Sequence, residues 1–153
     1  MDESVRILVV DDDESIRKTI AAILEEKGYI VDTAENGKAA IEKSNANFYN
    51  LALIDIRLPD MEGTRLLAEM KETTPKMVKI IVTGYPSLQN AITVVNRGAD
   101  GYLLKPVNID SLLETIKRHL EKQREARRYS EEKVAEFIRT RVKELETVPN
   151  QKP

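Results

Sequence analysis

The sequence contains no cysteine and no tryptophan, and it has only two phenylalanines among 153 residues. The lack of cysteine excludes disulfide bonds and thiolate metal sites. The net charge is only -2, so no global positive field directs the chain to nucleic acid or to a membrane surface. No apolar run approaches the ~20 residues that span a bilayer, and residues 1–4 lack the basic-then-apolar pattern of a signal peptide. These absences predict a cytoplasmic protein that binds neither nucleic acid nor membranes directly.

Short apolar runs alternate with amphipathic helical patterns along the chain. The predicted strands are Arg6–Val10, Tyr29–Thr33, Leu51–Asp55, Val78–Thr83 and Gly101–Leu104. The predicted helices are Glu14–Lys27, Asn36–Asn45, Thr64–Glu72, Ser87–Asn96 and a last helix that begins near Asn108. Strands that alternate with helices are typical of parallel sheets with right-handed crossovers. The sequence therefore predicts an α/β protein, a three-layer α/β/α sandwich around five parallel strands.

The composition changes after this alternating region. We predict one domain at residues 1–120 and a charged helical tail or linker with a frayed end at residues 121–153. Ser130 with two following glutamates is typical of a new helix start. The heptad seam that begins at Ile109 fails by Arg127, which argues against a long coiled coil. The tail is too short for a DNA-binding output domain. It is either a docking or dimerisation helix or the beginning of a linker to a further domain.

Charged side chains follow three of the predicted strands where each strand ends. Asp11 and Asp12 follow the first strand, and Asp55 ends the third. Lys105 follows the fifth strand, and Thr83 ends the fourth. The carboxyl ends of parallel strands share one edge of the sheet, where α/β proteins build their sites. Because clustered carboxylates repel one another, they favour a hard cation such as Mg²⁺. A carboxylate in such a site can act as a nucleophile toward phosphorus.

Each of these residues alone has an ordinary explanation. A lone aspartate at a strand end is usually a turn or capping residue, and Asp13 fits that role before the helix at Glu14. Lys105 alone would be a solvated surface lysine, and Tyr102 alone would be half-buried sheet surface. His119, the only histidine, is best explained as a partly exposed helix residue rather than a phosphate donor. The joint pattern at successive strand ends is far more specific than any of its members.

Four segments together resemble the receiver domain of two-component response regulators, the CheY-like superfamily, over about residues 5–120. They are Ile7–Asp13, Asp55 with the downstream Leu58–Gly63, Val82–Tyr85 and Gly98–Pro106. The resemblance implies a flavodoxin-like, doubly wound sheet with strand order 2-1-3-4-5. It also implies that Asp55 accepts a phosphoryl group from a sensor histidine kinase. On this basis the chain would be a phosphorylation-activated signalling switch and not a metabolic enzyme.

The same resemblance implies roles for the other site residues. Mg²⁺ would be held by Asp11, Asp12, Asp55 and the carbonyl of Arg57. Thr83 and Lys105 would contact the phosphoryl group, and the Lys105–Pro106 bond would be cis. On phosphorylation Thr83 would move toward the phosphate and Tyr102 would turn inward. This movement would change the face formed by the fourth helix, the fifth strand and the fifth helix, which would bind a downstream protein partner. Homodimerisation of the active form is left open.

Two rival classes share parts of this pattern. An aspartate-based phosphohydrolase requires a second acid two residues after the nucleophile, where this chain has Arg57. A flavin or nucleotide carrier on the same fold requires a phosphate loop rich in glycine, serine or threonine. Residues 11–14 are all acidic here and would repel phosphate without a metal. A degenerate receiver is disfavoured because every expected site residue is present.

Overall fold

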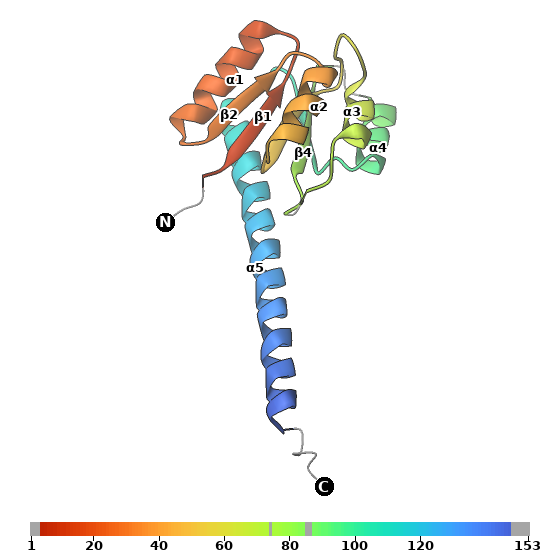
Figure 1. Cartoon of the computed structure of the whole chain (residues 1–153). Coiled ribbons are helices and arrows are strands. Elements are labelled where there is room, and N and C mark those ends of the chain that lie inside the picture. The colour runs from red at the N-terminus through yellow and green to blue at the C-terminus, as the bar shows by residue number, and fades with distance from the viewer. Residues whose placement is uncertain (1–3, 74, 85–86, 148–153) are drawn as a thin grey trace.

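The computed structural model describes residues 4–73, 75–84 and 87–147. Strands and helices alternate in the order β1 (Arg6–Val10), α1 (Glu14–Glu26), β2 (Ile30–Ala34), α2 (Gly37–Ala46), β3 (Leu51–Asp55), α3 (Gly63–Glu69), β4 (Val78–Thr83), α4 (Leu88–Asn96), β5 (Gly101–Leu104) and α5 (Ile109–Thr147). The strands form one parallel sheet in the order β2-β1-β3-β4-β5 (Figure 1). The predicted fold class and strand order are confirmed.

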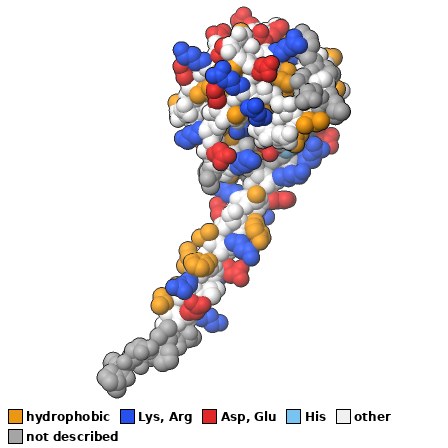
Figure 2. Space-filling model, turned by 90° about the vertical axis from the view of Figure 1, so that its right-hand side faces the viewer, with side chains coloured by type: hydrophobic (Ala, Val, Ile, Leu, Met, Phe, Trp, Pro, Cys, Tyr) orange, Lys and Arg blue, Asp and Glu red, His pale blue; other side chains and the backbone are white. Residues whose placement is uncertain are grey.

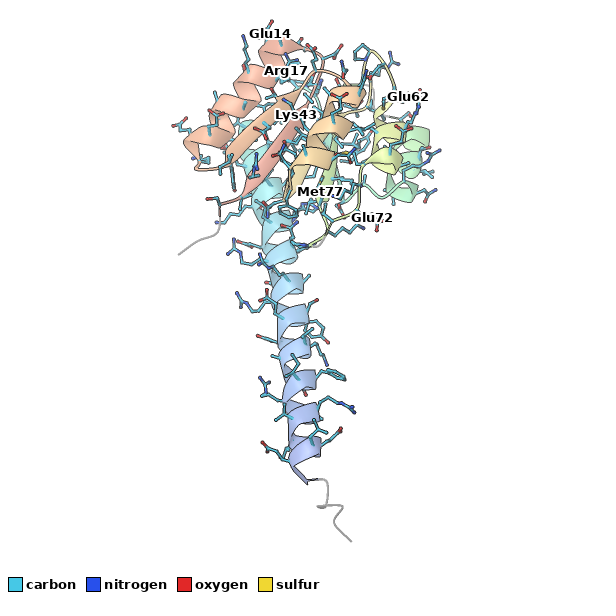
Figure 3. All side chains as sticks on the ribbon, viewed as in Figure 1. Glu14, Arg17, Lys43, Glu62, Glu72 and Met77 are labelled. Atoms are coloured by element: carbon cyan, nitrogen blue, oxygen red, sulfur yellow. The ribbon has the colours of Figure 1, made fainter. Side chains whose placement is uncertain are left out.

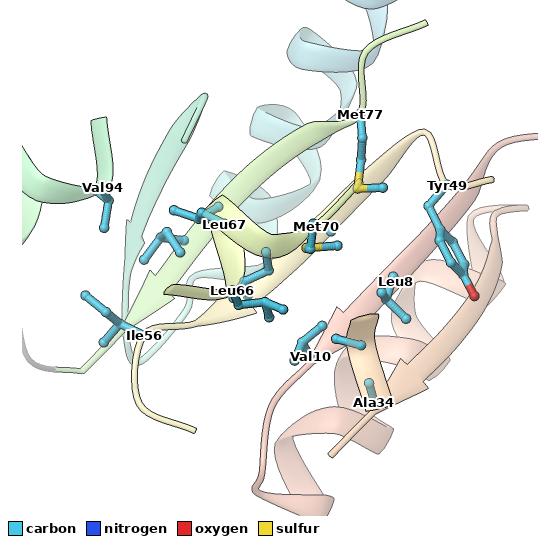
Figure 4. Close-up of a cluster of buried hydrophobic side chains, with 14 residues drawn as sticks. Leu8, Val10, Ala34, Tyr49, Ile56, Leu66, Leu67, Met70, Met77 and Val94 are labelled. Atoms are coloured by element: carbon cyan, nitrogen blue, oxygen red, sulfur yellow. The ribbon is translucent and has the colours of Figure 1, made fainter. Parts of the chain in front are cut away.

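Helices cover both faces of this sheet, which gives the predicted three layers (Figure 1). One core lies between the sheet and α2, α3 and α4, and Figure 4 shows its side chains, among them Leu8, Leu66 and Val94. A second core lies between the opposite face and helices α1 and α5, with Leu24 and Leu112 fully buried in it. Because both faces are covered, the runs Ile7–Val10, Leu51–Ile54 and Ile80–Val82 in β1, β3 and β4 are apolar without alternation.

The bounds of β1, β3, β4 and β5 agree with the prediction, and β2 begins one residue later than predicted. As predicted, β2 is an edge strand, and Ile30 at its start is exposed. Helix α1 begins at the predicted cap, since the Asp13 carboxylate accepts a hydrogen bond from the Ile16 N–H at 3.0 Å. Gly28, with φ at 93°, follows the end of α1 and provides the left-handed conformation that closes many helices.

The prediction for the tail is wrong in one respect. Ser130 does not begin a new helix, because α5 runs without interruption from Ile109 to Thr147 (Figure 1). The segment has no glycine or proline, and an ion pair of 3.2 Å joins Arg127 and Glu131 one turn apart. A capping pattern within such a segment does not interrupt it. Among the described residues, no helix has both the length and the apolar content needed to cross a membrane. The predicted fraying at residues 148–153 lies outside the described residues.

Gln123 fastens α5 to the domain where the helix leaves it. Its side-chain amide donates to the carbonyls of Asn50 and Lys76, at 2.9 and 2.8 Å. The Asn50 side-chain amide donates back to the side-chain oxygen (Oε1) of Gln123 at 3.3 Å. Beyond this point the helix projects alone from the domain (Figure 1).

Lys79, the second residue of β4, is the one described lysine that is buried. Its ammonium group donates to the carbonyl of Leu67 at 3.3 Å, which lies in the last turn of α3. Burial lowers the pKa of Lys79, and the nearby Lys76 lowers it further. The charged form is therefore disfavoured in the folded protein.

We expect Lys79→Met to raise the free energy of unfolding at pH 7 by about 1 kcal/mol, because it removes a buried charge. The lowered pKa means that the folded protein releases this proton before the unfolded chain does. The cost of the charge is therefore fully present below the folded pKa, and it disappears as the pH rises toward the unfolded pKa of about 10.4. Urea denaturation of both proteins between pH 7 and 10 measures the difference, which should shrink as the pH rises. A constant difference would contradict this explanation.

Candidate functional site

Three carboxylates meet at the carboxyl edge of the sheet. Asp11 and Asp12 follow β1, and Asp55 ends the adjacent β3. One carboxylate oxygen of each residue lies within 4.8 Å of those of the other two. Asp11 and Asp55 are buried, whereas Asp12 is exposed. The structure therefore brings together the acid pair and the single acid that the sequence places on separate strands.

Lys105 completes this cluster from the end of β5. Its ammonium nitrogen lies 2.8 Å from an Asp11 oxygen and 3.1 Å from an Asp55 oxygen. The peptide bond between Lys105 and Pro106 is cis, as the family resemblance implies. Since four-fifths of the Lys105 side chain is shielded from solvent, both ion pairs are screened less than surface pairs are.

Burial and pairing oppose each other in the electrostatics of the cluster. Burial raises the pKa of Asp55, and the hydrogen bonds from the Arg57 N–H and from Lys105 offset only part of this effect. For Lys105, burial would lower the pKa, but the hydrogen bonds to Asp11 and Asp55 outweigh it and the pKa is raised. One ammonium is shared by two carboxylates, so each acid receives only part of its stabilisation. The metal-free cluster is left with excess negative charge.

The chain after Asp55 turns sharply back toward the site. The Arg57 N–H donates to an Asp55 carboxylate oxygen at 3.1 Å, and the Gly63 N–H donates to the Ile56 carbonyl at 2.7 Å. A Cβ at Gly63 would lie 2.5 Å from the Asp55 carbonyl oxygen. Glycine is therefore required where α3 begins, because a side chain there would displace the backbone that carries the acid.

Thr83 and Tyr102 lie on the strands beside the cluster. Thr83 ends β4 and is fully buried, and it lies one residue beyond Val82, the register partner of Asp55. Tyr102 on β5 packs against the core that contains Val94. Its hydroxyl is buried and has no hydrogen-bond partner among the described residues. Tyr85, which belongs to the motif after Thr83, lies outside the described residues.

Arg17 was not singled out by sequence reasoning, although it holds the backbone of Asp11 in place. Its guanidinium donates to the Asp11 carbonyl at 2.8 Å, and the Asp13 N–H donates to an Asp11 carboxylate oxygen at 2.9 Å. Figure 3 shows Arg17 and Glu62 at the upper end of the domain, opposite the end from which α5 projects.

His119 has a structural position and lies outside the carboxylate cluster, since its ring nitrogens lie 2.8 and 3.1 Å from the carbonyls of Thr115 and Asp100.

The donor set of the cluster fits a hard divalent cation. Asp11, Asp12 and Asp55 offer carboxylate oxygens close enough to bind one ion, and oxygen is the ligand atom that Mg²⁺ prefers. No thiolate or imidazole is present in the group. The arrangement can therefore bring a cation, an ammonium group and a carboxylate nucleophile to one point.

The family model described as "Response regulator receiver domain" matches residues 7–117. Among solved structures, a CheY-like response regulator receiver domain protein from Methanospirillum hungatei JF-1 is 48% identical, with a TM-score of 0.78 over 81% of this chain and 99% of that chain. The beryllofluoride-activated NtrC4 receiver domain dimer is 38% identical, with a TM-score of 0.72 over 77% of this chain and 98% of that chain.

A curated relative, the transcriptional regulatory protein ZraR of Klebsiella oxytoca, is 40% identical over 118 residues. This match covers 77% of the chain but only 27% of ZraR. The same holds for ZraR of Escherichia coli strain K12, which is 36% identical over 27% of its length. The chain thus spans about a quarter of the length of these two relatives.

Proposed function

The chain belongs to the response regulator receiver domain family, and we propose that it accepts a phosphoryl group on Asp55 from a sensor histidine kinase. The observation that carries the proposal is the contact of one lysine with two of three converging carboxylates. A structural ion pair requires one acid, whereas a phosphoryl acceptor requires a nucleophile and additional positive charge around it. In this proposal the protein is a switch and not a metabolic enzyme.

In the proposed reaction an oxygen of the Asp55 carboxylate attacks the phosphorus of a phosphohistidine. The new O–P bond forms as the P–N bond breaks, and the electron pair of the broken bond stays on the imidazole nitrogen. The raised pKa of Asp55 makes its carboxylate more basic and thus more nucleophilic. The Lys105 ammonium, already 3.1 Å from Asp55, would move little to contact the phosphoryl oxygens. Thr83 would donate its hydroxyl to the same group.

Mg²⁺ would be held by Asp11, Asp12, Asp55 and the carbonyl of Arg57. When bound, it supplies positive charge that stabilises the equatorial phosphoryl oxygens. The buried Asp11 carboxylate accepts a hydrogen bond from the backbone N–H of Asp13, so the orientation of one ligand is fixed before the cation binds. The exposed Asp12 leaves the site open to solvent and to the donor.

The proposed output surface is the face formed by α4, β5 and α5. Apolar side chains are exposed on all three elements: Ile92, Val95, Leu104 and Ile109. The buried hydroxyl of Tyr102 has no hydrogen-bond partner in the described part of the chain. This costs free energy in the present conformation and favours a second position for the ring. We infer that phosphorylation shifts Thr83 and Tyr102 together and thereby changes this face for a downstream protein partner.

The projecting part of α5 is a second contact surface in this proposal. Figure 2 shows apolar side chains along it, and they are exposed at Val134, Phe137, Ile138, Val142 and Leu145. Such a row favours a protein contact, either a homodimer or a docking partner. ZraR is named a transcriptional regulatory protein, but the absence of direct nucleic-acid binding by this chain stays a prediction, as does its cytoplasmic location.

Incubation with a small phosphodonor tests the proposal, with and without Mg²⁺. Intact-mass spectrometry should find one added phosphoryl group per chain, and only in the presence of the metal. Metal-independent modification, or none with any donor, would contradict the proposal. Pull-down experiments with both states then identify partners of the α4-β5-α5 face.

A further inference from the structure

The loop between β3 and α3, residues 56–62, is fastened to the beginning of α2 by Asp60. One carboxylate oxygen accepts the Gly37 N–H at 2.8 Å, and the other accepts the Lys38 N–H at 2.9 Å. Both donors belong to the first turn of the helix, where backbone N–H groups have no intrahelical acceptor. The helix dipole also favours a carboxylate there, and the two hydrogen bonds lower the pKa of Asp60.

An apolar contact lies beside these hydrogen bonds. Met61 packs so closely on Gly37 that a Cβ at Gly37 would overlap the Met61 thioether. The loop therefore rests on α2 through a charged residue and its apolar neighbour at the same place. Asn36 caps α2 separately, because its side-chain oxygen accepts a hydrogen bond from the Ala39 N–H, within the helix itself, at 2.8 Å.

The same loop carries Arg57 past the carboxylate cluster. The Arg57 N–H donates to Asp55, and the Leu58 N–H donates to the Met61 carbonyl at 3.2 Å. Gly63 closes the loop against the Ile56 carbonyl. The segment from Arg57 to Met61 is thus a short closed turn, and Asp60 is its charged attachment to a different element.

We propose that Asp60 is a positioning residue for the divalent cation site. By holding the loop on α2 it restricts the movement of the Arg57 backbone relative to the carboxylates, and with it the carbonyl that would bind the cation. Asp60 touches neither the cation nor the phosphoryl group, and it acts only through the loop. This inference rests on the proposed function, because it assumes that the cluster binds a cation through that carbonyl.

Three variants test the proposal: Asp60→Ala, Asp60→Asn and, as the matched control, Asn36→Ala. Asp60→Ala removes the attachment of the loop and two contacts of the helix N-terminus. Asn36→Ala weakens the same helix N-terminus, at a cost of roughly 0.5–2 kcal/mol, but leaves the loop attached. Asp60→Asn keeps one carbonyl oxygen as an acceptor. Urea denaturation verifies that all three variants are folded.

The readout is Mn²⁺ binding without any phosphodonor, measured from the electron paramagnetic resonance of free Mn²⁺. We expect Asp60→Ala to bind about tenfold more weakly than the parent, in the range found when groups that orient metal ligands are removed. The Mn²⁺ affinity of Asp60→Asn should lie between those of Asp60→Ala and the parent, and Asn36→Ala should bind Mn²⁺ as tightly as the parent does. Parental affinity in Asp60→Ala overturns the proposal, and so does an equal loss in Asn36→Ala.

The two proposals fail in different ways. A parent protein that binds Mn²⁺ but accepts no phosphoryl group counts against the proposed function alone, while the binding series still decides the role of Asp60. A parent protein that binds no Mn²⁺ at millimolar concentration overturns the proposal for Asp60 directly.

Discussion

Asp55→Asn is expected to abolish covalent phosphorylation, because an uncharged amide is a very poor nucleophile toward phosphorus. The substitution should leave the protein folded. Burial raises the pKa of Asp55, so the folded state binds that proton more readily than the unfolded chain does. The ionised Asp55 carboxylate therefore lowers the free energy of unfolding at neutral pH, and the uncharged amide removes this effect. Intact-mass spectrometry after incubation with a phosphodonor and Mg²⁺ measures the effect.

Asp13→Asn is the matched control for this experiment. Asp13 lies two residues from Asp11 in the sequence, but its carboxylate caps α1, a role that asparagine also performs. We expect Asp13→Asn to be phosphorylated at the parental rate. Persistent modification of Asp55→Asn at that rate would show that another side chain is the acceptor.

Lys105→Met is expected to slow phosphorylation by about 10²-fold, the usual effect of removing one charged or hydrogen-bonding group from a transition state. Its ammonium contacts Asp11 at 2.8 Å and Asp55 at 3.1 Å. Without it three carboxylates remain, and the pKa of Asp55 rises further because the lowering effect of Lys105 is lost. The initial rate at saturating Mg²⁺ measures the change, since saturation separates the role of the lysine from cation binding.

Lys105→Arg keeps the charge but spreads it over a planar group with different geometry. It should retain more activity than Lys105→Met while staying below the parent. The raised pKa of Lys105 means that its pairing stabilises the fold below the unfolded pKa, and this contribution is lost only as the pH rises through the folded value. Lys105→Met should therefore also be less stable than the parent at pH 7. An unchanged rate in Lys105→Met would contradict the role given to its charge.

The sheet could be predicted because its central strands β1, β3 and β4 are buried on both faces. In a chain where strands alternate with helices, a continuous apolar run such as Leu51–Ile54 indicates a buried strand. The charged residues at the ends of these runs can be read from the sequence as well. The edge strand β2 was placed one residue too early because its mixture of polar and apolar residues defines its bounds poorly. Helix α3 ends at Glu69 and not at Glu72, since Met70 adopts an extended backbone.

What the sequence did not reveal depends on contacts between distant segments. Asp60 resembles any loop aspartate until its position against Gly37 is known, 23 residues away. Lys79 resembles a surface residue in an apolar strand, although it is buried beneath α3. The Ser130 pattern predicted a helix start because capping residues are recognised locally. The continuous helix instead reflects the absence of any breaking residue from Ile109 to Thr147.

The most direct test of the central claim is the location of the phosphoryl group. The phosphorylated protein is treated with borohydride, which reduces an acyl phosphate to an alcohol and marks the modified aspartate as homoserine for peptide sequencing by mass spectrometry. Our account predicts homoserine at position 55 alone, and only when Mg²⁺ was present during phosphorylation. Homoserine at Asp11 or Asp12, or a phosphoryl group on His119 that borohydride leaves intact, would contradict it.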